Sequence, residues 1–298
     1  MPVYQLDEGL WFPNPKYGEP DGLFAVGGDL SVNRLLLAYS HGIFPWYAYQ
    51  LYDEPHWYCP MDRFVIFPKE IHISHSMKQL MRQGKYHITM NQDFKGVINA
   101  CSKADSRNTD MGAWLGPQMI RAYTQLYKMG IAHSVEVWEV EETENGRLRI
   151  SESNQTCLNC RVEAGSTKSK RKTENYEVKM GNYASTPSPY GDSTLPQGEK
   201  GTENEINKTE NGVHNSHRLV GGLYGIALNG AFFGESMFSL VPSASKLALI
   251  QLARHLEKKG YSFIDCQFET PHLCSMGGRH IPYDDYMAML RANAEREK

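Results

Sequence analysis

The sequence predicts an α+β protein in which helices pack on a largely antiparallel sheet. Strand-like segments follow one another directly at 218–228 and 230–238, as the two arms of a hairpin do. A helical pattern ending at Gly260 separates them from another strand-like segment at 261–268. The 298 residues, of which 41% are hydrophobic, are sufficient for a sizeable core.

The first 60 residues are expected to form a small separate domain. It contains one helical pattern, with Ser31 as the N-cap and Gly42 just beyond the helix end. Gly27 and Gly28 indicate a tight turn. No lysine or third glycine follows at the spacing of a nucleotide-binding loop, so we do not expect this turn to hold phosphate.

A short helix is predicted next, beginning at a cap on Ser74 or Ser76 and ending at Gly84. Three basic side chains share one of its faces: His75, Lys78 and Arg82. They are three and seven positions apart, which places them together on a helix. The spacing alone favours an ordinary solvated face over a binding surface.

Strands and helices then alternate. Residues 86–105 are typical of a strand followed by a helix, and residues 115–138 of an amphipathic helix, a stop at Gly130 and a strand. The helix that begins at Pro242, with Ser243 or Ser245 as its cap, is apolar around much of its circumference. We therefore expect it to pack both on the sheet and on another element. A final helix is predicted over 282–295.

A long polar segment interrupts this pattern at about 141–217. It is rich in Glu, Asn, Ser, Thr, Gly and Lys and contains no Trp or Phe. Such a segment buries too little apolar surface to offset the entropy lost on ordering. We interpret it as a mostly disordered insertion into the turn of a β-hairpin, since both flanks are strand-like.

Charge and motifs exclude several classes. A net charge of −3 argues against a generally basic nucleic-acid coat but permits a local basic patch. No apolar run approaches the roughly 18 residues of a membrane helix, so no membrane contact is expected. No nucleophile elbow, zinc-protease motif or P-loop occurs. The loop by which acetyltransferases hold the coenzyme A pyrophosphate is missing as well.

The six cysteines are expected to remain thiols in a reducing cytoplasm, because no secretion signal is visible. Cys157 and Cys160 form the only CxxC motif. One such pair supplies half the ligands of a structural zinc site, and no second pair or HxxxH motif completes it. We therefore expect no metal.

Polar residues in two strand-like segments are the candidates for chemistry. Asp265 and Gln267 lie two positions apart and would share one face of a regular strand. They are either a satisfied polar pair that fastens a loop or a paired acceptor site. Glu235 could bind an ammonium group or cap the following turn.

Seven fragments together resemble leucyl/phenylalanyl-tRNA–protein transferases, namely GGDL…GIFPWY, HISHSMK, HSVEVW, GGLYGIA, FFGESMFS, ASKLAL and FIDCQF…SMGG…IP. They occur in the order of the family and cover nearly all of the chain outside 141–217. The resemblance implies a small N-terminal domain, then an acetyltransferase-like (GNAT) domain over 61–298 with a mixed sheet. The absent coenzyme A loop agrees with a tRNA ester as the donor.

The implied activity is transfer of Leu, Phe and, less readily, Met from aminoacyl-tRNA to an N-terminal Arg or Lys of a protein. This transfer creates an N-terminal degradation signal. Aminoacyl-tRNA is a co-substrate, and no cofactor is implied. We expect a cytoplasmic monomer. The classes that compete with this one are a small-molecule acetyltransferase, a peptidoglycan aminoacyl transferase and a non-catalytic tRNA-binding module.

The resemblance also implies residue roles. The catalytic Asp and Gln correspond to Asp265 and Gln267, and His75, Lys78 and Arg82 to the tRNA-contacting helix. Trp46 and Trp114 correspond to the tryptophans that hold the donor's terminal adenosine. The donor side-chain pocket corresponds to Leu223, Phe232, Leu249, Leu252, Leu256 and Ile264, with Glu235 close by.

Three features depart from the family or from regular geometry. Several pocket positions that can be Phe or Met in relatives are Leu here, which leaves the preference among Leu, Phe and Met open. His75 and Gln79 stand where relatives can have arginine. A regular strand would also point Ile264 away from Asp265, so we expect a bulge or a site that straddles the strand.

Overall fold

The computed structural model describes residues 3–105, 114–140 and 217–296, all within one compact unit. Among these residues it contains seven α-helices and two mixed sheets, so the predicted α+β class is confirmed. The segment interpreted as an insertion, 141–217, lies outside the described residues except for His217, which opens a strand. The same is true of Cys157 and Cys160.

The larger sheet has seven strands in the order β11-β5-β10-β9-β8-β7-β6. Its neighbours are antiparallel except for β9 and β10, which run parallel. The mixed, largely antiparallel sheet is therefore confirmed. The strands are β5 (Asp62–Ile66), β6 (Tyr86–Met90), β7 (Ala132–Val140), β8 (His217–Leu228), β9 (Ala231–Ser239), β10 (Phe263–Asp265) and β11 (Arg279–Pro282).

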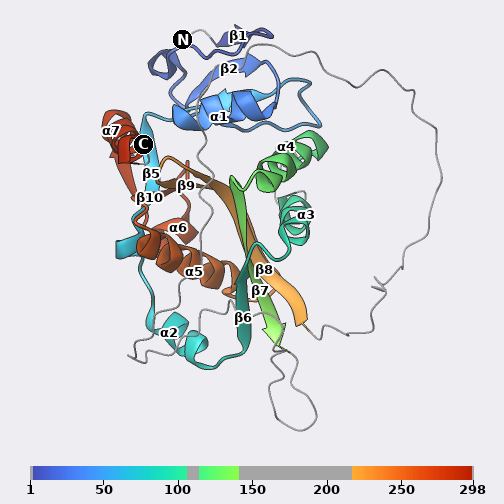
Figure 1. The fold of residues 1–298 in the computed structure, drawn as a ribbon, viewed down its shortest axis with the longest axis vertical. Coiled ribbons are helices and arrows are strands. Elements are labelled where there is room, and N and C mark those ends of the chain that lie inside the picture. Colours follow the sequence, from blue (N-terminus) through green and yellow to red (C-terminus); the bar gives the residue numbers. More distant parts are fainter. Residues whose placement is uncertain (1–2, 106–113, 141–216, 297–298) are drawn as a thin grey trace, which may run out of the picture. The chain divides into compact units, whose positions relative to one another are not determined.

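Helices cover both faces of this sheet (Figure 1). On one face, α5 packs against β7 and β8 through a cluster of leucine, isoleucine and valine side chains. On the other face, α3 and α4 build a second, more aromatic core together with α1. The helices of the large sheet are α2 (His75–Arg82), α3 (Phe94–Asp105), α4 (Pro117–Lys128), α5 (Ala244–Lys259), α6 (Pro271–Ser275) and α7 (Tyr283–Arg296).

Helix termini follow the predicted signals in part. The Ser74 hydroxyl caps α2 by accepting from Met77 N, which decides between the two candidate serines. Gly260 ends α5 in the left-handed conformation at φ +78°, as a C-terminal glycine does. One of the two serines predicted to start α5, Ser243, stands at its N-cap position. Ser243 itself takes φ +69° and makes no side-chain cap bond; instead, Ser239 Oγ accepts from Ser245 N.

The N-terminal residues form a four-stranded sheet in the order β1-β2-β4-β3, with α1 beside it. Ser31 caps α1 and Gly42 follows it at φ +72°, as predicted. The predicted tight turn is also present, because Gly27 and Gly28 both have positive φ. The elements are β1 (Tyr4–Leu6), β2 (Leu23–Gly27), α1 (Val32–Ser40), β3 (Phe44–Pro45) and β4 (His56–Tyr58), with short 3-10 turns at Pro15–Tyr17 and, further along, Pro68–Glu70.

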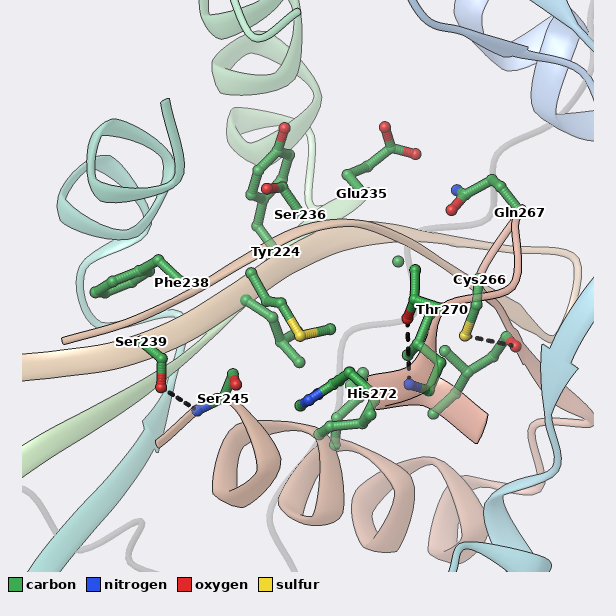
Figure 2. Close-up of a pocket in the computed structure, with 17 residues that line it drawn as sticks. Tyr224, Glu235, Ser236, Phe238, Ser239, Ser245, Cys266, Gln267, Thr270 and His272 are labelled. Carbon is green, nitrogen blue, oxygen red and sulfur yellow. Dashed lines mark hydrogen bonds between the residues drawn. The ribbon is translucent and has the colours of Figure 1, made fainter. Parts of the chain in front are cut away.

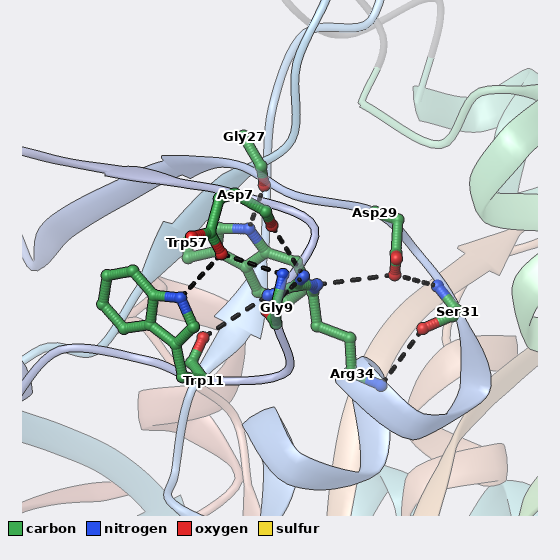
Figure 3. A network of polar contacts seen from close by, with 8 residues as sticks. All are labelled: Asp7, Gly9, Trp11, Gly27, Asp29, Ser31, Arg34 and Trp57. Atoms are coloured by element: carbon green, nitrogen blue, oxygen red, sulfur yellow. Dashed lines mark hydrogen bonds and ion pairs between the residues drawn. The ribbon is translucent and has the colours of Figure 1, made fainter. Parts of the chain in front are cut away.

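A buried arginine holds this N-terminal region together (Figure 3). Arg34 on α1 is 1% exposed, and its guanidinium donates to the carbonyls of Asp7, Gly9 and Trp11. Its Nε lies 3.4 Å from Asp29 Oδ1. A planar group with five donors can satisfy several carbonyls of an irregular segment at once, so Arg34 fixes a stretch that has little secondary structure of its own.

The chain passes from the small sheet to the large one between Tyr58 and Asp62. A division into two separate domains at residue 60 stays a prediction. The two regions are in direct contact, because Tyr39 on α1 hydrogen-bonds to Glu235 on β9. The surfaces that build the site below therefore come from both regions.

Candidate active site

The site lies where two parallel strands stop pairing. Strand β10 pairs with β9 at three positions and ends at Asp265, which is opposite Phe233. Strand β9 continues to Ser239. Beyond Asp265 the chain turns away, and Gln267 adopts φ +59°. Side chains occupy part of the space that opens beside β9, and the rest of this space is a pocket.

The prediction that Asp265 and Gln267 share one face of an extended strand is therefore wrong. The strand ends between them, and the positive φ of Gln267 breaks the alternation of faces. This turn also removes the geometric conflict at Ile264. Ile264 and Gln267 both line the pocket, whereas Asp265 faces the other way.

The pocket has a volume of about 440 Å³ and lies between β8, β9, α5 and the segment that follows β10 (Figure 2). Most of the side chains predicted to hold the donor side chain or to lie beside it do line the pocket: Leu223, Glu235, Leu249, Leu252 and Ile264. Phe232 and Leu256 do not line it, because both are buried in the apolar cluster behind it. The structure thus brings the predicted apolar set together in two layers.

Asp265 is completely buried behind the pocket and is fully occupied by partners. Its Oδ1 accepts from Arg63 Nε at 2.8 Å and from Gln267 N at 2.9 Å. Its Oδ2 accepts from Arg63 Nη2 at 2.7 Å and from Tyr286 Oη at 2.8 Å. The adjacent Asp265 raises the pKa of Arg63 above its usual value in spite of burial, which acts in the opposite direction, so the guanidinium stays charged.

The bond from Gln267 N to Asp265 ties the turn to the ion pair. The Gln267 side chain lines the pocket and makes no hydrogen bond to another described residue. Its amide is therefore free to bind a ligand with its carbonyl oxygen, its NH₂ group or both. In this arrangement Gln267 contacts the pocket and Asp265 positions Gln267.

Glu235 occupies a β-bulge. Tyr224 is opposite Ser236 and Gly225 is opposite Gly234, which leaves Glu235 as the extra residue of β9. A bulge redirects a side chain and is frequent beside active sites. Here the carboxylate is directed towards α1 and α4, where Tyr39 Oη donates at 2.7 Å and Tyr123 Oη at 2.6 Å.

Burial raises the pKa of Glu235 from 4.5 to about 7. The hydrogen bonds from Tyr123 and Tyr39 and the charge of Arg63 oppose this rise, and the charge of Asp265 adds to it. Burial and the Glu235 charge also hold the pKa of both tyrosines well above 10. The phenols therefore stay protonated donors, and Glu235 changes charge near neutral pH.

The opposite end of the pocket is polar and was not predicted. Ser239, Ser245 and His272 line it (Figure 2). His272 Nε2 is buried without a hydrogen-bond partner among the described residues. Burial and then the charge of Lys246 lower the pKa of His272, so the imidazole is neutral near pH 7. The histidine lies four residues beyond the predicted strand segment 261–268, and the sequence there gives no sign that it turns inward.

The two predicted adenosine-binding tryptophans are placed differently, and neither lines the pocket. Trp46 is 38% exposed and its ring lies 5.1 Å from that of Phe268, the residue after Gln267. Tyr58 completes this aromatic surface at 5.5 Å from Trp46. Trp114 is partly buried against the core that α1, α3 and α4 share. Of the two, Trp46 is the more exposed.

The predicted basic face lies on α2. His75, Lys78 and Arg82 are exposed, while Met77 between them is buried. Within the residues that the structure describes, no cluster of three or more His, Cys, Asp or Glu could hold a metal ion. None of the described helices is long and apolar enough to cross a membrane.

Comparison with known proteins gives matches over both regions of the chain. A family described as leucyl/phenylalanyl-tRNA protein transferase matches residues 65–170 and 210–291. The N-terminal domain of that same family matches residues 28–61.

Individual proteins named leucyl/phenylalanyl-tRNA–protein transferase are similar along almost the whole chain. The protein from Desulforapulum autotrophicum is 36% identical, with 100% of this chain and 95% of the relative covered. The one from Thermodesulfovibrio yellowstonii is 33% identical, with 100% and 89% covered. The one from Nitrosomonas eutropha is 36% identical, with 91% and 82% covered.

Proposed function

This chain belongs to the leucyl/phenylalanyl-tRNA–protein transferase family, and from that premise we propose that it transfers Leu, Phe and, less readily, Met from aminoacyl-tRNA to an N-terminal Arg or Lys of acceptor proteins. The observation that carries the proposal is the apolar pocket with Glu235 and Gln267 at one end. Such a pocket offers an apolar side chain a dry site and keeps polar groups beside the reacting atoms.

The pocket chemistry supports an apolar donor residue. Leu249, Leu252 and Ile264 offer only hydrocarbon to the donor side chain. One methylene more or less changes binding in such a pocket by about 1–3 kcal/mol. Leu, Phe and Met are therefore all expected to enter, with modest preferences among them, whereas a charged side chain would lose its hydration without a partner.

The reaction needs little chemical activation. The donor is an ester and the acceptor is an amine, so positioning accounts for most of the required rate. We assign Gln267 and Asp265 to the catalytic site: Gln267 holds the acceptor amine with its side-chain carbonyl, and Asp265 fixes Gln267. The ester already contains the activation energy, and we therefore propose that no cofactor takes part.

We propose that the donor tRNA binds through two surfaces. Trp46 and Trp114 hold the terminal adenosine, where stacking on an aromatic ring contributes roughly 1–3 kcal/mol whatever the tRNA sequence. His75, Lys78 and Arg82 contact the phosphate backbone from α2.

Wider consequences follow from the same activity. An N-terminal Leu or Phe added to Arg or Lys would mark the acceptor protein for degradation. Charged tRNA is found in the cytoplasm, where we place this protein, as a monomer. The large sheet, with β9 and β10 parallel and separating at the pocket, is the arrangement that we assign to an acetyltransferase-like (GNAT) fold.

The test is a transfer assay with labelled Leu-tRNA and a peptide that begins with Arg. We expect label to enter the peptide, with less transfer to a peptide that begins with Glu or Ala. Acetyl-CoA and a cell-wall precursor serve as competing donor and acceptor. Turnover only with acetyl-CoA as donor would indicate a small-molecule acetyltransferase, and transfer only to the cell-wall precursor would indicate a peptidoglycan aminoacyl transferase. Binding of tRNA without any transfer would indicate a non-catalytic tRNA-binding module.

A further inference from the structure

We propose that Glu235 is the residue that takes the proton from the attacking acceptor amine. This inference rests on the proposed transfer reaction and names a further catalytic residue for it. Three structural observations carry it: the saturation of Asp265, the bulge that aims Glu235, and the composition of the pocket wall.

Asp265 has no capacity left for a substrate proton. Each of its oxygens accepts two hydrogen bonds. Arg63 donates one to each oxygen, Gln267 N donates to Oδ1 and Tyr286 donates to Oδ2. A carboxylate offers about four lone-pair sites, so all are used. A proton taken up by either oxygen would displace one of these hydrogen bonds. Asp265 is buried and does not line the pocket.

Glu235 has the properties that Asp265 lacks. It is the one carboxylate among the described residues that line the pocket. Its two partners, Tyr39 and Tyr123, are neutral phenols that bond one to each oxygen, which leaves lone pairs open. Among the described residues it has no ion pair with a cation.

The position of Glu235 fits the role. In Figure 2 Glu235 and Gln267 lie at the same end of the pocket, apart from Ser239, Ser245 and His272. An amine that donates to the Gln267 carbonyl would therefore have a carboxylate at hand. The β-bulge places the carboxylate there. In a regular β9 without the extra residue, the alternation of side chains would direct Glu235 differently.

The proton balance closes without a co-reactant. The neutral α-amine attacks the ester carbonyl, and a C–N bond forms. Glu235 takes one proton from the nitrogen as this bond forms. The C–O bond to the terminal ribose then breaks, and the ribose oxygen takes that proton from the Glu235 carboxyl. The products are an amide and a free hydroxyl, and Glu235 returns to its ionised form.

The environment of Glu235 matches this exchange. A base works best when its pKa lies near the operating pH, and burial raises the pKa of Glu235 to about 7. The ionisable or charged groups that face it are Tyr39 from α1, Tyr123 from α4, Asp265 from β10 and Arg63 from β5. The tyrosines stay protonated donors, and Glu235 is the group of this set whose pKa is raised to about 7.

The experiment measures the second-order rate constant for an Arg-terminal peptide, with labelled Leu-tRNA, from pH 5.5 to 8.5. In the wild-type protein both Glu235 and the acceptor amine must lose a proton, so the logarithm of the rate rises with a slope near 2 at the acidic end. Glu235→Gln should be about a hundredfold slower at pH 7. Its slope should fall to 1, because only the amine still titrates.

A matched control comes from the same sheet. Glu136 on β7 is a buried carboxylate that is held by Ser134 and Thr89 and does not line the pocket. Glu136→Gln should retain the wild-type rate and slope. A Glu235→Gln protein within threefold of wild type at pH 7, or one that is slow but keeps a slope of 2, would overturn the assignment.

A second variant keeps the test valid if Glu235→Gln misfolds. The Tyr123 hydrogen bond lowers the pKa of Glu235, so Tyr123→Phe should move the bend of the profile to higher pH. An unmoved bend would count against Glu235 as the titrating base. If the wild-type protein transfers no label at all, the proposed function fails instead, and the two failures stay distinct.

Discussion

Arg63 and Asp265 form a two-pronged ion pair that is almost wholly excluded from solvent, with 1% and 0% of their side chains exposed. The Arg63 guanidinium also lies 4.8 Å from the Phe44 ring centre and 4.9 Å from that of Tyr286. Phe44 belongs to the small sheet, Asp265 to the large one and Tyr286 to α7. Arg63 therefore joins three parts of the chain at the back of the pocket.

Replacing Arg63 by an apolar residue should lower the free energy of unfolding substantially. Arg63→Leu leaves the Asp265 carboxylate buried without its cation, and breaking a buried pair in this way costs about 3–5 kcal/mol. Unfolding in urea, followed by circular dichroism, measures the loss. The double variant Arg63→Leu, Asp265→Leu should recover part of it, because no buried charge remains.

The matched control for this prediction is the exposed pair of Arg279 and Glu70. Solvent screens that pair, so Arg279→Leu should change stability by no more than about 1 kcal/mol. Equal losses of unfolding free energy for Arg63→Leu and Arg279→Leu would show that burial does not make the inner pair more stabilising than the exposed one.

Glu235 should make folding stability depend on pH in the opposite sense to an ordinary acid. Its pKa is raised from 4.5 in the unfolded chain to about 7 in the folded one. Between these values the folded protein holds a proton that the unfolded chain has lost. Its contribution to stability is therefore complete below pH 4.5 and disappears as pH rises to 7.

The size of this effect is roughly 3 kcal/mol, at 1.36 kcal/mol for each unit of pKa. Urea unfolding of wild type and Glu235→Gln across pH 4–8 isolates it, because other titrating groups cancel in the difference. The wild-type protein should lose stability relative to the variant as pH rises. A difference that stays constant over this range would contradict the raised pKa.

Gln267 should be replaceable by glycine without loss of the fold. Its φ of +59° is costly for any residue with a Cβ, and glycine adopts it freely. Gln267→Gly should therefore unfold within about 1 kcal/mol of wild type, whereas transfer to an Arg-terminal peptide should fall steeply because the side-chain amide is gone. Gln267→Val should lose both stability and transfer, since a branched side chain is strained there.

Asn229 provides the control for the backbone effect. It also has a positive φ, in the turn between β8 and β9, and it does not line the pocket. Asn229→Gly should match Gln267→Gly in stability and keep full transfer. If Gln267→Gly transfers label as fast as Asn229→Gly, the Gln267 amide has no part in the reaction.

Sequence patterns predicted the parts of the fold that depend on local chemistry. The Ser31 cap, the glycine stops at Gly42 and Gly260, and the strands on either side of 141–217 follow from capping and alternation within a few residues. The family resemblance, rather than local patterning, brought together most of the residues that line the apolar pocket.

The details that define the site depend on distant partners, and the sequence near each residue does not contain them. Strand β10 stops at Asp265 because Arg63, some 200 positions away, and Gln267 N hold its carboxylate. The bulge at Glu235 exists only in relation to β8. A lone arginine in the apolar run of β5 was the one available signal for a buried anion, and it does not say which one.

The basic face of α2 is tested by salt dependence, because phosphate contacts release bound counterions. Lys78 and Arg82 are exposed and share that face. The double variant Lys78→Ala, Arg82→Ala should weaken tRNA binding and reduce the slope of log affinity against log salt by roughly 1 to 2, at about 0.7–0.9 per contact. Lys258→Ala, Lys259→Ala at the end of α5 removes equal charge from another exposed site and should leave the slope almost unchanged. Equal slopes for both double variants would mean that α2 acts only through net charge, and its basic side chains would then be an ordinary solvated face.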